Sequence, residues 1–196
     1  MEWLKQFLGI PNRSSLSGSS TRRITLNDPL VIKAPRIGFL NLLGSSGQAI
    51  LKEDQAALGP LFASLEESDS APPVCDVLLI YAHVQHDGSI AGTDDGLREL
   101  IRKSAAPIVM IASENSGDGY VAAGKRTGYG QANLVMTLKR KGPLFGQFFG
   151  QLFRRMFEGK TMPLAWVELA PQSPKALHIN CPEIFAAGAS HIVFRH

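Results

Sequence analysis

The sequence is short of cysteine and of long apolar runs, and each shortage narrows what the protein can be. Cys75 and Cys181 are its only cysteines, which fits a compartment where thiols stay reduced. No apolar run approaches the roughly 20 residues needed to span a bilayer. Residues 1–10 carry Glu2 and lack the apolar segment and cleavage site of a secretory signal. We therefore expect a cytoplasmic protein that is not transmembrane.

Length and composition suit one globular domain with a short appendage. The chain has 196 residues, the size of a single domain, and its hydrophobic share of 44% allows a real core. Residues 1–11 predict a short amphipathic helix, too short to be stable unless it docks elsewhere. The serine-rich stretch that follows predicts a linker over residues 12–34. The folded body is expected over residues 35–196.

Two apolar runs end in polar loops, as strands do when both their faces are covered. Residues 77–82 are entirely apolar or aromatic, and the run stops at His83. Residues 107–112 behave alike and open into the polar loop 113–119. Open α/β sheets present working side chains at the carboxyl edge of their strands. If these strands are parallel neighbours, His83 and the second loop share one edge, where a site should lie.

The remaining pattern alternates strands with helices. Thr93 is the expected N-cap of one helix, and the aromatic stripe of the helix over 143–158 predicts core packing rather than a cofactor site. We expect an α/β fold with a mainly parallel central sheet of about five or six strands and helices on both faces. The other predicted elements are parallel strands over 37–43 and 132–138, a last strand over 192–194, helices over 48–65, 93–103 and 162–169, and a polar loop over 66–73.

Neither glycine-rich turn predicts a cofactor site. Residues 44–47 read as a plain strand-to-helix connection rather than an anion-binding turn. Residues 119–127 nearly match a phosphate-binding loop, but Arg126 stands where a hydroxyl residue should follow the lysine, and Thr127 comes one place late. We therefore expect no cofactor and no metal.

Four segments keep an order and spacing that resemble a protein family. They read RIGFLNLLGSSGQ at 36–48, DVLLIYAH at 76–83, IVMIASENSGDG at 108–119 and FFGQLFRRMFEGKTMPLAW at 148–166. In that order they resemble the opening strand, the strand ending in the catalytic His, the strand ending at the catalytic Cys and the closing helix pair of CHAT domains, bacterial relatives of caspases. The resemblance covers roughly residues 35–170. It implies a caspase-like three-layer sandwich that acts in bacterial signalling or defence.

The chain departs from this family at the nucleophile. The resemblance puts His83 in the catalytic His position, followed by Val84 where the family has Gly. Glu114 or a neighbour stands where the family has its Cys. Cys75 begins the strand that His83 ends, about eight residues and roughly 25 Å away, while Cys181 lies beyond the matched segments. We therefore expect a pseudo-peptidase that catalyses nothing and binds a peptide or protein partner. Its expected binding residues are His83, Asp87, Ser113 and Glu114.

Two other functions stay open. Ser113 or Ser116, activated by His83, would make a hydrolase of altered chemistry. Basic residues gathered in the 125–160 region would make a weak, salt-dependent polyanion-binding module, or they balance the acidic half of the chain across a self-association contact. For Asp87 and Ser113, capping of a turn explains the residue type equally well. The basic residues proposed for such contacts are Lys125, Arg126, Lys139, Arg140 and Lys141.

Overall fold

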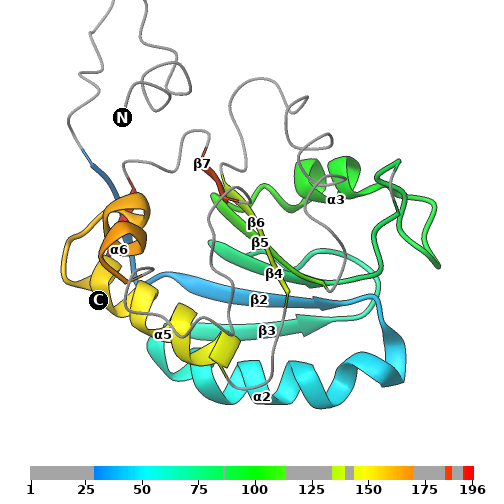
Figure 1. Cartoon of the computed structure of the whole chain (residues 1–196), viewed down its shortest axis with the longest axis horizontal. Helices are drawn as coiled ribbons and strands as arrows, with labels where there is room; N and C mark the ends of the chain where they lie inside the picture. The colour runs from blue at the N-terminus through cyan, green and yellow to red at the C-terminus, as the bar shows by residue number, and fades with distance from the viewer. Residues whose placement is uncertain (1–28, 86, 114–133, 140–143, 170–183, 187–191) are drawn as a thin grey trace, which may run out of the picture.

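A computed structural model of the whole chain shows an α/β fold built on a parallel sheet (Figure 1). Among the described residues, no helix has the length and apolar character needed to cross a membrane. The predicted helix over residues 1–11 and most of the predicted linker lie outside the described part of the chain. The structure describes residues 29–85, 87–113, 134–139, 144–169, 184–186 and 192–196.

The main sheet has six strands among the described residues, in the order β3-β2-β4-β5-β6-β7. Every neighbouring pair from β3 to β6 is parallel, and β7 is antiparallel to β6. The prediction that β2, β4, β5 and β6 are parallel neighbours is confirmed. The strands are β2 (Arg36–Asn41), β3 (Ser64–Ser68), β4 (Val77–Tyr81), β5 (Ile108–Ser113), β6 (Leu134–Lys139) and β7 (Ile184–Ala186).

Strand β4 is buried on both faces, as its continuous apolar run predicts. Alternate residues point to opposite faces of a strand. Val77, Leu79 and Tyr81 belong to one apolar cluster with helices α2 (Gln48–Leu58), α5 (Leu144–Phe157) and α6 (Met162–Leu169). Leu78 and Ile80 belong to a second cluster, with α3 (Leu97–Ser104). The chain thus forms a layer of helices on each side of the sheet (Figure 1).

Helix α5 supplies much of the aromatic core, which confirms its predicted packing role. Phe149 lies against Phe145 and Phe153, with ring centroids 4.7 and 6.2 Å apart. Phe148 meets Trp166 of α6 edge to face at 4.9 Å. Side chains four apart fall on one face of a helix, so the aromatic spacing lays one continuous stripe on the sheet.

The helix predicted over 48–65 is wrong in its second half. Helix α2 ends at Leu58, and Gly59 and Pro60 enter a short 3-10 turn. Residues 64–68, which the sequence predicts as helix end and polar loop, form strand β3 and pair with β2 in parallel. The segment has little apolar patterning because it is an edge strand exposed along most of its length.

The predicted start of the next helix is also wrong. Helix α3 begins at Leu97, with Gly96 as its N-cap, four residues after the predicted start. Thr93 is not the cap, since its Oγ1 donates to the carbonyl of Asp95 at 2.7 Å. The carboxylate of Asp95 lies outside the helix and accepts from Lys103 Nζ at 2.7 Å, which orders the preceding turn.

The end of the predicted linker is part of the body. Residues 30–33 form strand β1 (Leu30–Lys33), which pairs in parallel with β8 (Ile192–Arg195) in a separate two-stranded sheet. The last strand therefore forms where the sequence predicts it, but outside the main sheet. Phe194 of β8 packs against Phe62 and Phe153 at 6.0 Å, so this small sheet joins the core on the α5 side.

One polar contact crosses the core between α2 and β4. The hydroxyl of Tyr81 donates to Asp54 Oδ2 at 2.8 Å, and both residues are completely buried. A buried carboxylate is costly unless donors surround it. The pair therefore fixes how α2 is set against the carboxyl end of β4.

Replacing Tyr81 with Phe should lower the free energy of unfolding by about 1–3 kcal/mol, because Asp54 loses a buried donor. Chemical denaturation of both proteins measures the difference. The double variant Tyr81→Phe, Asp54→Leu, compared with the two single variants, isolates the coupling energy between the hydroxyl and the carboxylate. Equal stability of Tyr81→Phe and the parent would show that the hydroxyl contributes nothing.

Candidate functional site

The sheet has a topological switch point between β2 and β4. From β2 the chain crosses through α2 to β3 on one side, and from β4 it crosses through α3 to β5 on the other. The two helices lie on opposite faces, and the carboxyl ends of strands beside such a switch point are the usual place of a ligand site. Asn41 stands level with Tyr81 there, and Leu42 N–H donates to the Tyr81 carbonyl at 2.8 Å.

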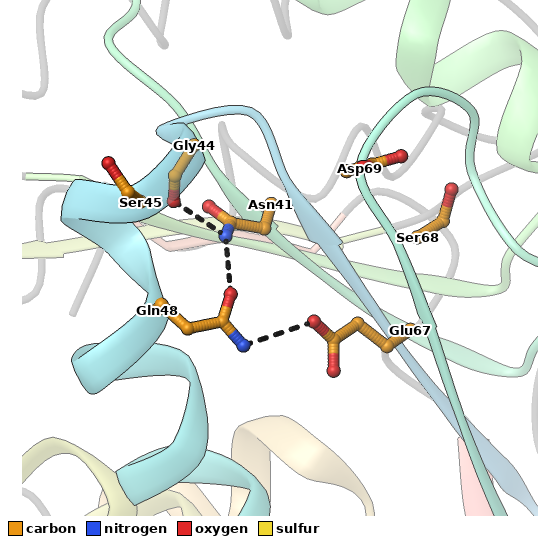
Figure 2. Close-up of a pocket in the computed structure, with 7 residues that line it drawn as sticks. All are labelled: Asn41, Gly44, Ser45, Gln48, Glu67, Ser68 and Asp69. Atoms are coloured by element: carbon orange, nitrogen blue, oxygen red, sulfur yellow. Dashed lines mark hydrogen bonds between the residues drawn. The ribbon is translucent and has the colours of Figure 1, made fainter.

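Asn41, the last residue of β2, organises the turn at this point. It is buried, and its Oδ1 accepts from Leu43 N–H at 3.1 Å while its Nδ2 donates to the Gly44 carbonyl at 3.0 Å. Nδ2 also lies 3.4 Å from Gln48 Oε1, at the start of α2 (Figure 2). In this way the Asn41 side chain links the end of β2 to the start of α2. The connection between them contains the 3-10 turn η1 (Gly44–Gly47).

A polar cavity of about 530 Å³ opens beside Asn41, between the ends of β2 and β3 and the start of α2 (Figure 2). Glu67 enters it from β3, held by Gln55 Nε2 at 2.9 Å and Gln48 Nε2 at 3.5 Å. Both donors are neutral amides, so they orient the carboxylate without cancelling its charge. The cavity is lined by Asn41, Gly44, Ser45, Gln48, Glu67, Ser68 and Asp69.

The loop after β4 holds His83 at the surface. Ala82 and Val84 are buried in the second cluster, and His83 between them is exposed. Val84 forms an isolated antiparallel bridge with Ile90, and Ala91 N–H reaches the His83 carbonyl at 3.4 Å. Val84, which stands where the resembled family has Gly, is thus the apolar anchor of this loop.

Asp87 caps its own turn. Its Oδ1 accepts from Ser89 N–H at 2.9 Å and from Ser89 Oγ at 2.7 Å. These hydrogen bonds, the side-chain one first, hold the pKa of the exposed Asp87 carboxyl below its ordinary value. The arrangement is the turn-capping alternative stated for this residue, and its predicted role in binding stays a prediction.

The ends of β4, β5 and β6 come together at the same edge. Tyr81 stands level with Ala112, which places Ser113 one residue further along the neighbouring strand. Ser113 in turn stands level with Lys139, the last residue of β6. His83 and the start of the 113–119 loop therefore share one edge, as predicted. The other predicted residues Glu114, Ser116, Lys125, Arg126, Arg140 and Lys141 lie outside the described part of the chain.

Cys75 lies at the amino end of β4, opposite His83. It is buried, and its pKa is raised to about 12, first by burial and then by the neighbouring charge of Asp76. The thiolate is the nucleophile in cysteine chemistry, so Cys75 cannot supply one at neutral pH. Cys181 lies outside the described residues. In the described ranges, no three His, Cys, Asp or Glu side chains gather to hold a metal ion.

Sequence reasoning missed the residues of the cavity. Glu67, Ser68 and Asp69 fall in the predicted polar loop 66–73, and nothing in the sequence brings that loop near Asn41. The one available signal was the small-residue turn 44–47 directly after a strand, a pattern often found at ligand sites.

No family model, curated protein or solved structure matches this chain. The likeness to CHAT domains therefore rests on the four segments and their order. Function has to be argued from the site itself.

Replacing Gly47 with Ala should disturb the cavity and lower the free energy of unfolding by about 1–3 kcal/mol. Gly47 has an ordinary φ of −83°, but an added Cβ would lie 2.4 Å from Asn41 Oδ1. Gly150→Ala in α5 is the matched control, because its Cβ would meet no atom closer than 3.9 Å. It should be neutral or stabilise by up to about 1 kcal/mol. Thermal and chemical unfolding measure the stability of both variants. If Gly47→Ala and Gly150→Ala change stability equally, the close contact at Gly47 is contradicted.

The raised pKa of Cys75 predicts a loss of stability at alkaline pH. The unfolded thiol ionises near its ordinary pKa of 9.0, whereas the folded one keeps its proton to about 12. The stabilisation that the protonated Cys75 thiol contributes to the folded state is therefore complete below pH 9.0 and is lost as the pH rises toward 12. Denaturation curves between pH 8 and 10.5 should show a smaller decline for Cys75→Ala than for the parent. Identical slopes would mean that Cys75 titrates normally.

Proposed function

We propose that the protein is a non-catalytic, caspase-like domain that binds a peptide or protein partner at the carboxyl edge of its sheet. The observation that carries this proposal is the polar cavity between the ends of β2 and β3, on the same edge of the sheet as the exposed His83. Its groups are positioned before any ligand arrives, because Asn41 and Gln48 are fixed by hydrogen bonds. Such preorganisation lowers the ordering cost of binding.

The chemistry of the edge favours binding over cysteine catalysis. A thiol dyad needs sulfur within a few ångströms of an imidazole. In the described chain the thiol of Cys75 lies at the amino end of β4, buried and protonated, while His83 follows the carboxyl end. The imidazole is thus left as an exposed surface group at the carboxyl edge of the sheet.

The caspase-like part of the proposal rests on the order of the four resembled segments. It is supported by a mainly parallel sheet with helices on both faces, which the likeness to CHAT domains implies. A bacterial signalling or defence setting follows from the same resemblance.

A serine hydrolase is the second candidate, because the register brings Ser113 beside the end of β4. Activity would require an imidazole that removes the hydroxyl proton and donors that stabilise the oxyanion. The two candidates differ in whether a bound peptide is cut.

Peptides selected from a phage-displayed random library should bind the parent protein and lose affinity by about tenfold or more in two variants. His83→Ala removes the imidazole, and Ser45→Trp fills the mouth of the cavity. Ala56→Trp, at an exposed position on α2 outside the cavity lining, is the matched control and should bind normally. Fluorescence polarisation measures the affinities. Peptides that bind all four proteins equally would place the binding site elsewhere and overturn the proposal.

The same peptides should be recovered intact after long incubation, and a thiol-alkylating probe should label no residue in a His83-dependent way. Cleavage that disappears in His83→Ala would establish the hydrolase instead. Labelling of Cys181 that disappears in His83→Ala would reveal a cysteine dyad formed by a residue beyond the described chain.

A further inference from the structure

Strand β3 has an unpaired edge among the described residues. It is the first strand of the sheet and pairs only with β2. Ala63 N–H donates to the Pro35 carbonyl at 2.9 Å. Backbone groups alternate in direction along a strand, so those of Ser64, Glu66 and Ser68 point away from β2. The result is a row of outward donors and acceptors along an exposed strand.

This edge carries negative charge that the described residues leave unpaired. Glu66 and Glu67 lie in β3 and Asp69 follows it, and none of the three forms an ion pair with another described residue. Three other acids of the same half of the chain form ion pairs. The pairs formed elsewhere are Asp76 with Arg36, Asp95 with Lys103 and Glu99 with Arg102.

The charge and the cavity are continuous. Glu67 and Asp69 line the cavity at the carboxyl end of β3, together with Ser68 between them (Figure 2). Gln48 and Gln55 hold the Glu67 carboxylate in place through neutral amides. A cation that enters the cavity would therefore meet an oriented carboxylate, with little ordering left to do.

We propose that β3 takes up an extended, basic segment of the partner protein as an additional edge strand. Backbone hydrogen bonds would form with the outward groups of Ser64, Glu66 and Ser68, and a Lys or Arg of the segment would enter the cavity at Glu67. This inference rests on the proposed function and names the chemistry of its partner.

Charge selects this occupant over its rivals. Antiparallel pairing of β3 with β3 of a second copy would set Glu66 against Glu66 in one register or Glu67 against Glu67 in the next, and like charges across strands repel. Nucleic acid and anionic lipid are repelled for the same reason. The edge also lacks the apolar surface that a hydrophobic partner would cover, because Leu65 is the only large apolar residue of β3.

The test uses a labelled nine-residue peptide of alternating Lys and Thr and a matched peptide with Glu in place of Lys. The Lys peptide should bind the full-length protein, and Glu67→Gln should weaken binding about tenfold, the size expected for a charge-assisted hydrogen bond. Glu158→Gln removes an exposed carboxylate from the turn after α5 and is the matched control, with affinity unchanged.

Two changes test the strand pairing separately from the charge. Glu66→Pro removes an outward N–H and leaves the inward bonds to β2 in place, and it should weaken binding about tenfold. Methylation of alternate backbone amides of the Lys peptide should abolish binding without altering the protein, which covers the case in which Glu66→Pro fails to fold. Three outcomes would each overturn the inference. The methylated peptide or the Glu peptide binds the parent protein as tightly as the Lys peptide does, or Glu67→Gln binds the Lys peptide as tightly as the parent does.

Failure here is distinguishable from failure of the proposed function. Library-selected peptides that depend on His83 and Ser45 but not on Glu66 or Glu67 would refute the basic β3 partner and leave binding at the carboxyl edge intact. Selected peptides whose affinity depends on none of the four positions would refute both the proposed function and the further inference.

Discussion

Burial of β4 on both faces is the constraint on which the rest of the structure depends. Its five residues are inaccessible to solvent, and they divide alternately between two apolar clusters. Each buried side chain of this size is worth about 1.5–3 kcal/mol, and none can contribute unless helices cover both sides. The fold therefore requires crossovers on opposite faces, with α2 on one and α3 on the other, which creates the switch point.

The same constraint sets the chemistry of the two ends of the strand. Parallel pairing keeps Asn41, Tyr81 and Ala112 level, so polar residues that follow them gather at one edge. The opposite end holds Cys75, where burial keeps the thiol protonated. Among the described residues, the thiol of Cys75 and the imidazole of His83 are separated by the length of β4, and Asn41 and Gln48 are held by hydrogen bonds at the carboxyl edge. Such an edge is suited to recognition.

Strand β3 links the edge of the sheet to the cavity. It contributes little to the core, since most of its length is exposed, yet it carries Glu67 to the cavity and presents backbone groups outward. A strand with that much uncompensated charge resists pairing with itself. Under the proposal that β3 accepts a basic segment, this composition serves selectivity between partners rather than stability.

The sequence by itself determined the buried strands, the aromatic helix α5 and the shared edge of His83 and Ser113. Continuous apolar runs and i, i+4 aromatic spacing report burial directly, because burial depends on side chains. Strand β3, the start of α3 and the cavity were decided only by the tertiary structure. Ser64–Ser68 reads as a helix end and a polar loop, because an edge strand is held by backbone bonds to β2 and needs no particular side-chain pattern. Asn41 and Glu67, 26 positions apart, line one cavity because that pairing carries β3 back beside β2. Local patterning in the sequence does not report a neighbour that is brought close through the backbone of another strand.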